Sequence, residues 1–304
     1  MKCSEQPSIF FEGNVPYTTD APAAPELFYA SKRGYSVLYR YTKEGKFRIL
    51  KGLLPQFAGN PVYEKLLRKE FEIGYELDHP NICRVFSYTY MEGIGNCIEM
   101  EWVDGYNLSE AVTAGTGKPE PKRIICQLCD ALSYIHSKQV IHRDLKPTNI
   151  VITHNGGNVK IIDFGLSDTD WHSIHKEAAG TKAYAAPELL AGEATDLRCD
   201  IWSLGKIILD LAPQYKRIAY KCLAPDKRKR YQNALDVKNA ILKQYPKSLI
   251  IGIITVSIAI LGTIAFTVYA NNTTNNSLKA IDTLFEDVGK NIWETGGNSV
   301  TPPQ

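Results

Sequence analysis

The chain has 304 residues, a formal net charge of +2 and a hydrophobic fraction of 44%, which is ordinary for a folded protein of one large domain with extensions or of two small domains. A charge this close to neutral excludes the strongly basic composition of many nucleic-acid-binding proteins, so no nucleic-acid partner is expected. Of the seven cysteines, only Cys126 and Cys129 form a C-x-x-C pair, and no second pair lies at the spacing of a zinc site, which argues against a metal site; thiols without a disulfide pattern fit a reducing compartment.

The first 26 residues contain several prolines and show no sustained hydrophobic period, so we expect an extended lead-in. The segment that follows predicts two pairs of strands with a helix between them. The helix, at residues 62–77, ends shortly before Pro80. The expected strands are residues 36–41 and 47–50, joined by a turn at Gly45, and residues 84–90 and 97–102, joined by a turn at 93–95.

From Leu108 onward the apolar residues fall mostly at helical spacing. The exception is a hairpin in which a turn of Asn and Gly residues joins a strand at 150–153 to a strand at 159–162. A small β-rich half therefore precedes a larger helical half, which predicts an α+β fold. The cleft between two such halves is a natural ligand site.

The strongest chemical signal is the segment I-H-R-D-L-K-P-T-N at residues 141–149, followed by D-F-G at residues 163–165. Phosphoryl transfer requires charge neutralisation and in-line positioning rather than covalent chemistry from the protein, and these residue types supply both. Asp144 can accept the proton of a substrate hydroxyl. Asn149 and Asp163 offer the hard oxygen ligands that Mg²⁺ prefers.

In this order and spacing, the two motifs resemble the catalytic loop and the metal-binding loop of eukaryotic-like, Hanks-type Ser/Thr protein kinases. The resemblance covers residues 27–243 and implies a two-lobed α+β fold with ATP and Mg²⁺ as cofactors and a protein substrate that carries a Ser or Thr hydroxyl. It implies that Asp144 is the catalytic base and that Lys146 contacts the transferred phosphoryl group, as in enzymes with Ser/Thr substrates. It also implies that Asn149 and Asp163 bind the metal.

Upstream, F-R-I-L-K resembles the strand whose lysine, here Lys51, contacts the α- and β-phosphates. Its expected ion-pair partner is Glu70 rather than Glu72, because residues two apart on a helix point about 200° away from each other. In the phosphate loop, Ser31, Arg33 and Ser36 stand where the family has three glycines. The nucleotide contacts that the resemblance implies, besides Lys51, are Ser31, Gly34, Ser36 and Leu38 in this loop and strand, and Met100, Glu101 and Val103 in the strand and hinge beside adenine.

Downstream, G-T-K-A-Y-A-A-P-E resembles the end of the activation segment, where Thr181 would contact the catalytic loop. Glu188 is expected to pair with a buried Arg230, and Asp200 is expected to brace the catalytic loop. The stretch after Gly205 is shorter than in the family, so a helix and loop that dock substrates and regulators are expected to be missing.

Residues 248–270 form an uncharged run of 23 residues, which spans about 34 Å as a helix and can cross a bilayer. Residues 227–247 carry seven Lys or Arg, and the tail at 271–304 carries two. The positive-inside rule therefore predicts a single-pass protein of the cell membrane with the kinase-like part in the cytoplasm and the tail outside. Small residues recur every four positions in the run, which would allow a homodimer through this helix.

Two interpretations of the function stay open: an active ATP-dependent Ser/Thr protein kinase, and a pseudokinase that binds nucleotide and signals by conformation. A kinase acting on small molecules is less favoured, because the segment before Glu188 resembles a platform for peptide substrates. The sequence favours the active enzyme over the pseudokinase, because pseudokinases usually lack at least one member of the catalytic set and this chain has all five: Lys51, Glu70, Asp144, Asn149 and Asp163.

Overall fold

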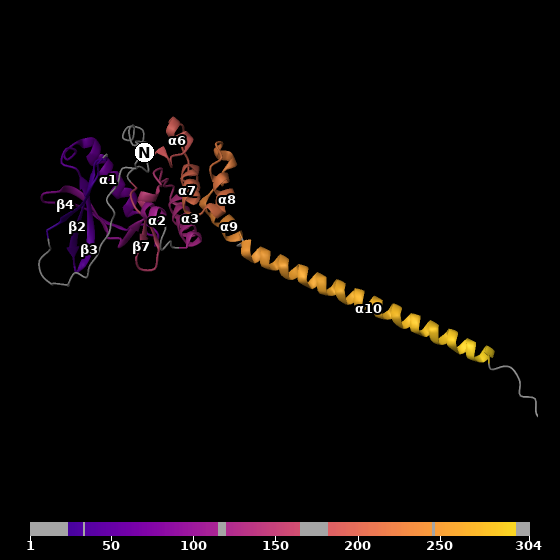
Figure 1. Ribbon diagram of the computed structural model, residues 1–304. Coiled ribbons are helices and arrows are strands. Elements are labelled where there is room, and N and C mark those ends of the chain that lie inside the picture. The colour runs from indigo at the N-terminus through magenta and orange to yellow at the C-terminus, as the bar shows by residue number, and fades with distance from the viewer. Residues whose placement is uncertain (1–23, 33, 115–119, 165–181, 245–246, 296–304) are drawn as a thin grey trace, which may run out of the picture. The chain divides into compact units, whose positions relative to one another are not determined.

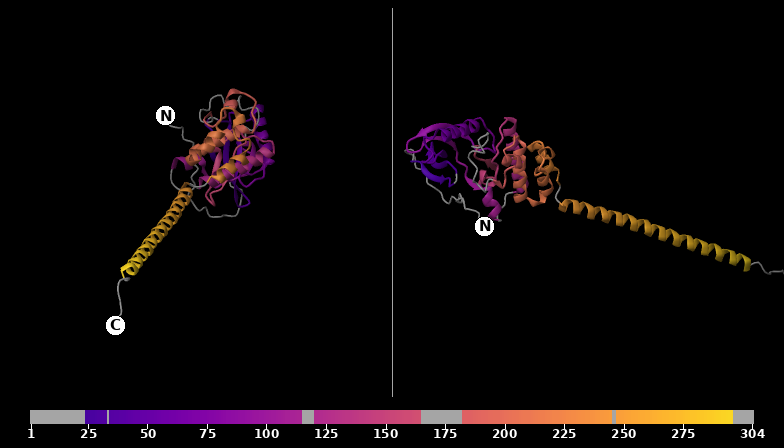
Figure 2. Two further views of the ribbon diagram at one scale, coloured as in Figure 1. Left: turned by 90° about the vertical axis from the view of Figure 1, so that its right-hand side faces the viewer. Right: turned by 90° about the horizontal axis from the view of Figure 1, so that it is seen from above.

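The computed structural model describes residues 24–32, 34–114, 120–164, 182–244 and 247–295. The chain divides into two compact units, residues 1–243 and residues 244–304. In the first unit, one lobe contains a sheet and helix α1, and the other contains helices α3, α7, α8 and α9 (Figures 1 and 2). The two-lobed α+β architecture predicted from the sequence is therefore confirmed.

The N-terminal lobe is a five-stranded sheet in the order β1-β2-β3-β5-β4, with antiparallel neighbours throughout. Helix α1 packs against β4 and carries the buried residues Leu66, Leu67 and Glu70. Its start is fixed by Asn60, whose side chain accepts a hydrogen bond from the Val62 N–H. The elements are β1 (Glu26–Ala30), β2 (Ser36–Lys43), β3 (Lys46–Leu53), α1 (Pro61–Tyr75), β4 (Val85–Met91) and β5 (Gly95–Glu101).

The C-terminal lobe is built around helix α3, whose apolar stripe has no exposure to solvent from Ile124 to Ile135. A short three-stranded sheet, in the order β6-β7-β8, lies at its edge toward the other lobe. The elements are β6 (Gly105–Asn107), α2 (Leu108–Ala114), α3 (Pro121–Ser137), η1 (Pro147–Asn149), β7 (Ile150–Thr153), β8 (Val159–Ile161), α6 (Pro187–Ala191), α7 (Arg198–Leu211), η2 (Pro213–Tyr215), α8 (Lys216–Cys222), η3 (Lys227–Lys229) and α9 (Ala234–Lys243).

The predicted strands, the predicted helix at 62–77 and the hairpin at 150–162 are all confirmed within a few residues. Two short strands were not predicted. Strand β1 begins at Glu26, inside the stretch taken as a lead-in, and lies at the sheet edge with mostly exposed side chains, so it shows no alternating pattern. Strand β6 has only three residues, too few for a periodicity to be visible.

The shortened stretch after Gly205 brings α8 directly onto α7. A Cβ placed on Gly205 would lie 2.6 Å from the Cβ of Cys222 and 3.2 Å from the Ala219 carbonyl oxygen. Only Ala212 and the three residues of η2 separate α7 from α8, so the two helices pack closely as an adjacent pair. Glycine at this position therefore follows from the short connection.

We expect Gly205→Ala to lower the stability of the first unit by about 1–3 kcal/mol, because a methyl group is forced into an already filled contact. The measurement is thermal unfolding of the full chain in detergent, followed by circular dichroism. Gly262→Ala is the matched control, because a Cβ at Gly262 would meet no atom within 4 Å. A Gly205→Ala protein as stable as the wild type would contradict the close packing of α7 on α8.

Nearly all of the described residues of the second unit form helix α10 (Lys247–Thr295). Its stretch Ile254–Val288 is long and apolar enough to cross a membrane, by length and composition alone. The helix extends well past residue 270, where the uncharged run ends, and so includes most of the predicted tail.

Candidate active site

Lys51 lies in the middle of β3 and is 5% exposed. Its ammonium group forms an ion pair with the carboxylate of Glu70 on α1 and a second one, 3.0 Å long, with Asp163 Oδ1. Glu72, two residues along α1, is exposed, as the helical spacing predicted. Three segments far apart in the sequence thus meet at one lysine, which is the arrangement expected of a phosphate-contacting cation.

The charges of this trio depend on one another. Burial alone would lower the pKa of Lys51, but the carboxylates of Asp163 and Glu70 outweigh it and raise that pKa. Burial raises the pKa of Glu70, while the Lys51 ammonium opposes the rise. Lys51 therefore stays protonated at neutral pH and can neutralise phosphate charge.

The catalytic loop brings Asp144, Lys146 and Asn149 together. Lys146 Nζ lies 2.7 Å from Asp144 Oδ2. The Asn149 Nδ2 donates to the Asp144 carbonyl oxygen at 2.9 Å and to Asp144 Oδ2 at 3.1 Å. Asp144 is 8% exposed, so its carboxylate is held in place by two side chains and largely shielded from water. Because Asn149 uses its nitrogen for Asp144, its oxygen Oδ1 is the atom left for a cation.

Asp200, at the start of α7, fixes the backbone of the catalytic loop through hydrogen bonds. Its Oδ2 accepts from the His142 N–H at 2.9 Å and lies 2.8 Å from His136 Nε2, and its Oδ1 accepts from the Arg143 N–H at 2.9 Å. Burial would raise the pKa of Asp200, but these hydrogen bonds and the nearby His136 lower it on balance. The predicted brace of the catalytic loop is present.

Two residues of the site have left-handed backbone conformations that side chains rarely adopt: Arg143 with φ of 61° and Asp163 with φ of 70°. Such conformations persist where the surrounding contacts over-determine them. At Arg143 the N–H is held by Asp200, and at Asp163 the carboxylate is held by Lys51. Contacts with Asp200 and Lys51 therefore help to stabilise both conformations.

Phe164 packs against the His142 ring, with 5.1 Å between the ring centroids, and is 4% exposed. Gly74 on α1 is buried, and a Cβ there would lie 2.7 Å from the Cγ2 of Val85. Helix α1 therefore approaches β4 closely at this glycine.

Glu188, at the start of α6, forms a bidentate ion pair with Arg230, at 2.6 Å for Nη1–Oε1 and 2.8 Å for Nη2–Oε2. Arg230 is 2% exposed and also donates to the Ala224 and Arg198 carbonyl oxygens. The predicted pair therefore exists, and it ties the end of the activation segment to the segment that precedes α9.

At the hinge, the strand register places Met100 opposite Ile49 and Lys51 opposite Leu38, so these side chains line neighbouring rows of the sheet. The Glu101 N–H donates to the Arg84 carbonyl oxygen at 2.8 Å, and the Glu101 carbonyl oxygen accepts from Cys83 Sγ at 3.6 Å. The carbonyl oxygen, which has a second lone pair, is the backbone atom of Glu101 that adenine could contact. Val103 is half-buried on the hinge between the lobes.

The phosphate loop joins β1 to β2. The Gly34 N–H donates to Ser31 Oγ at 2.7 Å, and the Ser31 N–H donates to the Ser36 carbonyl oxygen at 3.1 Å. The Ser31 hydroxyl therefore occupies an N–H that a phosphate oxygen could use. Arg33 and Thr181 were also expected near the phosphates or the catalytic loop, and both lie outside the described residues.

Sequence reasoning missed Tyr35 and the Glu101 side chain. Tyr35 is 8% exposed, and burial followed by the nearby Glu70 raises its pKa, so it packs as a neutral ring beside the Lys51–Glu70 pair. The Glu101 carboxylate pairs with Lys160 at 2.8 Å on the far side of the hinge. No sequence motif marks either residue. The Glu101–Lys160 pair joins residues that are distant in the sequence, and the place of Tyr35 beside the Lys51–Glu70 pair depends on its burial.

Comparisons with known proteins agree with this geometry. A family model of the protein kinase domain matches residues 35–253. The chain is 35% identical over 188 residues to an Aurora kinase of Dictyostelium discoideum, which covers 58% of this chain and 46% of that protein. It is 30% identical over 240 residues to the serine/threonine-protein kinase PknB of Mycolicibacterium smegmatis, which covers 64% of this chain and 38% of that protein.

Among solved structures, the PknI kinase domain of Mycobacterium tuberculosis superimposes with a TM-score of 0.56 at 20% identity, over 76% of this chain and 100% of that one. At this identity the likeness shows the fold alone. The chain spans less than half the length of the two curated relatives, at 46% and 38%.

Proposed function

The chain belongs to the protein kinase family, and we propose that it is an active enzyme that transfers the γ-phosphoryl group of ATP to a Ser or Thr hydroxyl of a protein. The observation that carries the proposal is the assembled trio of Lys51, Glu70 and Asp163 beside the coupled Asp144 and Lys146. A pseudokinase does not require both the Lys51 trio and the Asp144–Lys146 pair to keep this geometry. The name of the Mycolicibacterium relative, a serine/threonine-protein kinase, supports the choice of hydroxyl.

The donor set fits Mg²⁺, the metal that the family uses with ATP. Asp163 has a 42% exposed carboxylate, and the Asn149 oxygen is a neutral hard ligand of the kind that Mg²⁺ accepts. When bound, Mg²⁺ would neutralise charge on the β- and γ-phosphates. Asn149 and Asp163 would hold it, with Lys51 as a fixed cation beside them.

Several residues of the chain have separate roles in the phosphoryl transfer. The substrate hydroxyl oxygen forms a bond to the γ-phosphorus while the bond from that phosphorus to the bridging oxygen of ADP breaks, and the hydroxyl proton passes to Asp144. Lys146, 2.7 Å from Asp144, stabilises the charge on the moving phosphoryl group. Glu70 holds Lys51 in place against the phosphates.

The proposal is tested by incubating the purified full chain in detergent with γ-³²P-labelled ATP and a generic protein acceptor. Label should pass to protein in the presence of Mg²⁺ and stop when EDTA is added. Nucleotide binding without any transfer, at several acceptors and metal concentrations, would favour the pseudokinase instead.

The phosphate loop gives a kinetic prediction. Replacing Ser31 and Ser36 by Gly should lower the KM for ATP by about tenfold or more with little change in kcat, because a hydrogen bond to a charged group contributes roughly 1.5–3 kcal/mol. The physical reason is that the Gly34 N–H, now used by the Ser31 hydroxyl, becomes available to a phosphate oxygen. A lower KM at unchanged kcat indicates that the variant binds the substrate and the transition state more tightly by the same free energy.

Steady-state kinetics with ATP varied measures this effect, and Ser137→Gly, an exposed serine in the other lobe, is the control. An unchanged or higher KM in the double variant would show that the loop already holds the phosphates in another way.

For localisation, we propose a single-pass cell-membrane protein with the kinase unit in the cytoplasm and the end of the chain outside. The support is the helix stretch Ile254–Val288 together with the excess of Lys and Arg before it. Homodimerisation through this helix stays a prediction.

Protease treatment of intact cells and of inverted vesicles measures the topology. Protease outside cells should remove only the C-terminal end, and protease on inverted vesicles should degrade the kinase unit. Degradation of the kinase unit from outside intact cells would contradict the orientation.

A further inference from the structure

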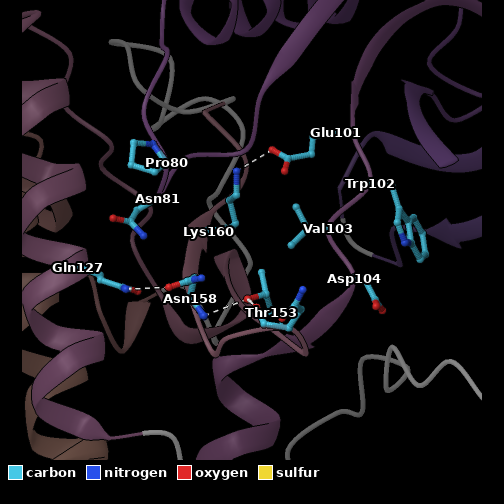
Figure 3. A pocket seen from close by; sticks show the side chains of 11 residues that line it. Pro80, Asn81, Glu101, Trp102, Val103, Asp104, Gln127, Thr153, Asn158 and Lys160 are labelled. Atoms are coloured by element: carbon cyan, nitrogen blue, oxygen red, sulfur yellow. Dashed lines mark hydrogen bonds and ion pairs between the residues drawn. The ribbon is translucent and has the colours of Figure 1, made fainter. Parts of the chain in front are cut away.

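Two neighbouring cavities lie behind the hinge, on the side of the Glu101–Lys160 ion pair, and together they are called the back groove. Figure 3 shows the residues that line the larger of the two. Their volumes are about 450 and 410 Å³, and none of the catalytic residues Lys51, Asp144 and Asp163 lines them. Both lobes contribute to the walls. The residues that the two cavities share are Pro80, Glu101 and Lys160.

The larger cavity combines apolar surface with polar side chains, which include several amides, the Glu101–Lys160 pair and the carboxylate of Asp104. Trp102, Val103 and Pro80 supply the apolar part. Gln127 Nε2 donates to Asn158 Oδ1 at 3.0 Å, so this part of the rim is already hydrogen-bonded (Figure 3). An occupant of this cavity therefore gains from an apolar or aromatic side chain.

The smaller cavity is basic. Four cations line it, Lys46, Arg48, Arg84 and Lys160, against the two carboxylates of Asp78 and Glu101. Lys160 pairs with Glu101 at 2.8 Å, and Arg48 lies 3.9 Å from a carboxylate oxygen of Glu99. The guanidinium carbon of Arg48 lies 3.8 Å from the centroid of the Phe86 ring, and this cation–π contact holds the guanidinium at the wall of the cavity. Lys46 and Arg84 are exposed, and within the described part of the chain neither has a carboxylate at ion-pair distance. An occupant of this cavity gains from acidic side chains.

The chain enters the first unit beside the back groove. Glu26, the first residue of β1, forms an ion pair with Arg40 at 2.8 Å, and Arg40 lies over the ring of Trp102 at 5.5 Å. Phe28 meets the same ring, with 5.2 Å between centroids. Trp102 lines the larger cavity, so the residues that precede β1 start at its edge.

The 23 residues before the described part have the composition that the back groove calls for. They carry three carboxylates (Glu5, Glu12 and Asp20) against one lysine, and an apolar run, Ile9 to Phe11. Between that run and Ala24 lie twelve residues, which can span roughly 40 Å when extended, ample to reach both cavities.

We propose that the N-terminal segment, residues 1–23, binds in cis to the back groove, with its Ile9–Phe11 run beside Trp102 and its carboxylates near Lys46 and Arg84. Because the groove has walls from both lobes, a segment seated there links the lobes behind the hinge. Binding in cis follows from the short connection to β1, which gives the segment a high effective concentration at the groove.

The test replaces Phe10 by the photocrosslinking residue p-benzoylphenylalanine in the full chain, in detergent, and maps the crosslinked peptides by mass spectrometry. The expected crosslinks join Phe10 to peptides that contain residues 78–86, 101–104 or 153–160, within one chain. Crosslinks to the catalytic loop or to α10, an absence of crosslinks, or crosslinks between chains that fade on dilution would each overturn the proposal.

Charge reversal tests the electrostatic part. Lys46→Glu with Arg84→Glu should lower the crosslink yield by about 3–10-fold, in line with the modest worth of exposed ion pairs. Adding Glu5→Lys, Glu12→Lys and Asp20→Lys should restore it. Lys138→Glu with Lys229→Glu, exposed cations that line neither cavity, is the matched control. An unchanged yield in the first variant would overturn the charge complementarity, and the readout needs no kinase activity.

Discussion

Asp144→Asn should lower kcat for protein phosphorylation by about 10²–10⁴-fold, because general base catalysis and positioning of the hydroxyl contribute about that much. The amide is nearly isosteric with the carboxylate and can still accept from Lys146, which lies 2.7 Å from Asp144 Oδ2. The loop backbone is fixed independently by Asp200. The variant should therefore fold and bind ATP with little change.

The measurement is kcat from labelled ATP at saturating nucleotide, with the ATP affinity and the melting temperature recorded alongside. Asp236→Asn, an exposed position on α9, is the matched control. An Asp144→Asn enzyme that turns over as fast as the wild type would show that Asp144 is not the base. A variant that no longer melts cooperatively would point to a structural role instead.

Arg230→Met should destabilise the first unit by about 3–5 kcal/mol, because it leaves the Glu188 carboxylate buried without its partner. Arg230 is 2% exposed and meets both oxygens of Glu188, at 2.6 and 2.8 Å. For a domain of this size the loss corresponds to a fall in Tm of roughly 6–20 °C. Thermal unfolding of the full chain in detergent measures it.

The double variant Arg230→Met with Glu188→Leu separates the loss of the pair from the cost of an unpaired charge. Replacing both partners by apolar residues of similar volume is often nearly neutral, so the double variant should be more stable than Arg230→Met alone. A single variant with wild-type Tm, or a double variant less stable than the single, would contradict the account of this ion pair.

The residues proposed to be catalytic could be predicted from the sequence because the chemistry of phosphoryl transfer fixes their types and the chain keeps them close together. Asp144, Lys146 and Asn149 lie within one turn of loop, and the hydrogen bonds among them follow from that proximity. The choice of Glu70 over Glu72 followed from helix geometry, and the structure buries the first and exposes the second.

Other features depend on contacts that no local pattern encodes. Strand β1 is too short and too exposed at the sheet edge to show a period. The Ser31 hydroxyl was assigned to phosphate binding from its position, yet it accepts from the Gly34 N–H, a local competition that only the loop geometry shows. The Glu101–Lys160 pair joins residues 59 positions apart, so the back groove was invisible from the sequence.

The measurement that tests the central claim most directly is the identity of the phosphorylated amino acid. The full chain is incubated with γ-³²P-labelled ATP, Mg²⁺ and a mixed protein acceptor, the product is hydrolysed in acid, and the labelled phosphoamino acids are separated. The presence of Lys146 two residues after Asp144 predicts label in phosphoserine or phosphothreonine, and none when Asp144 is replaced by Asn. Label only in phosphotyrosine, or the same label with Asp144→Asn, would contradict the account.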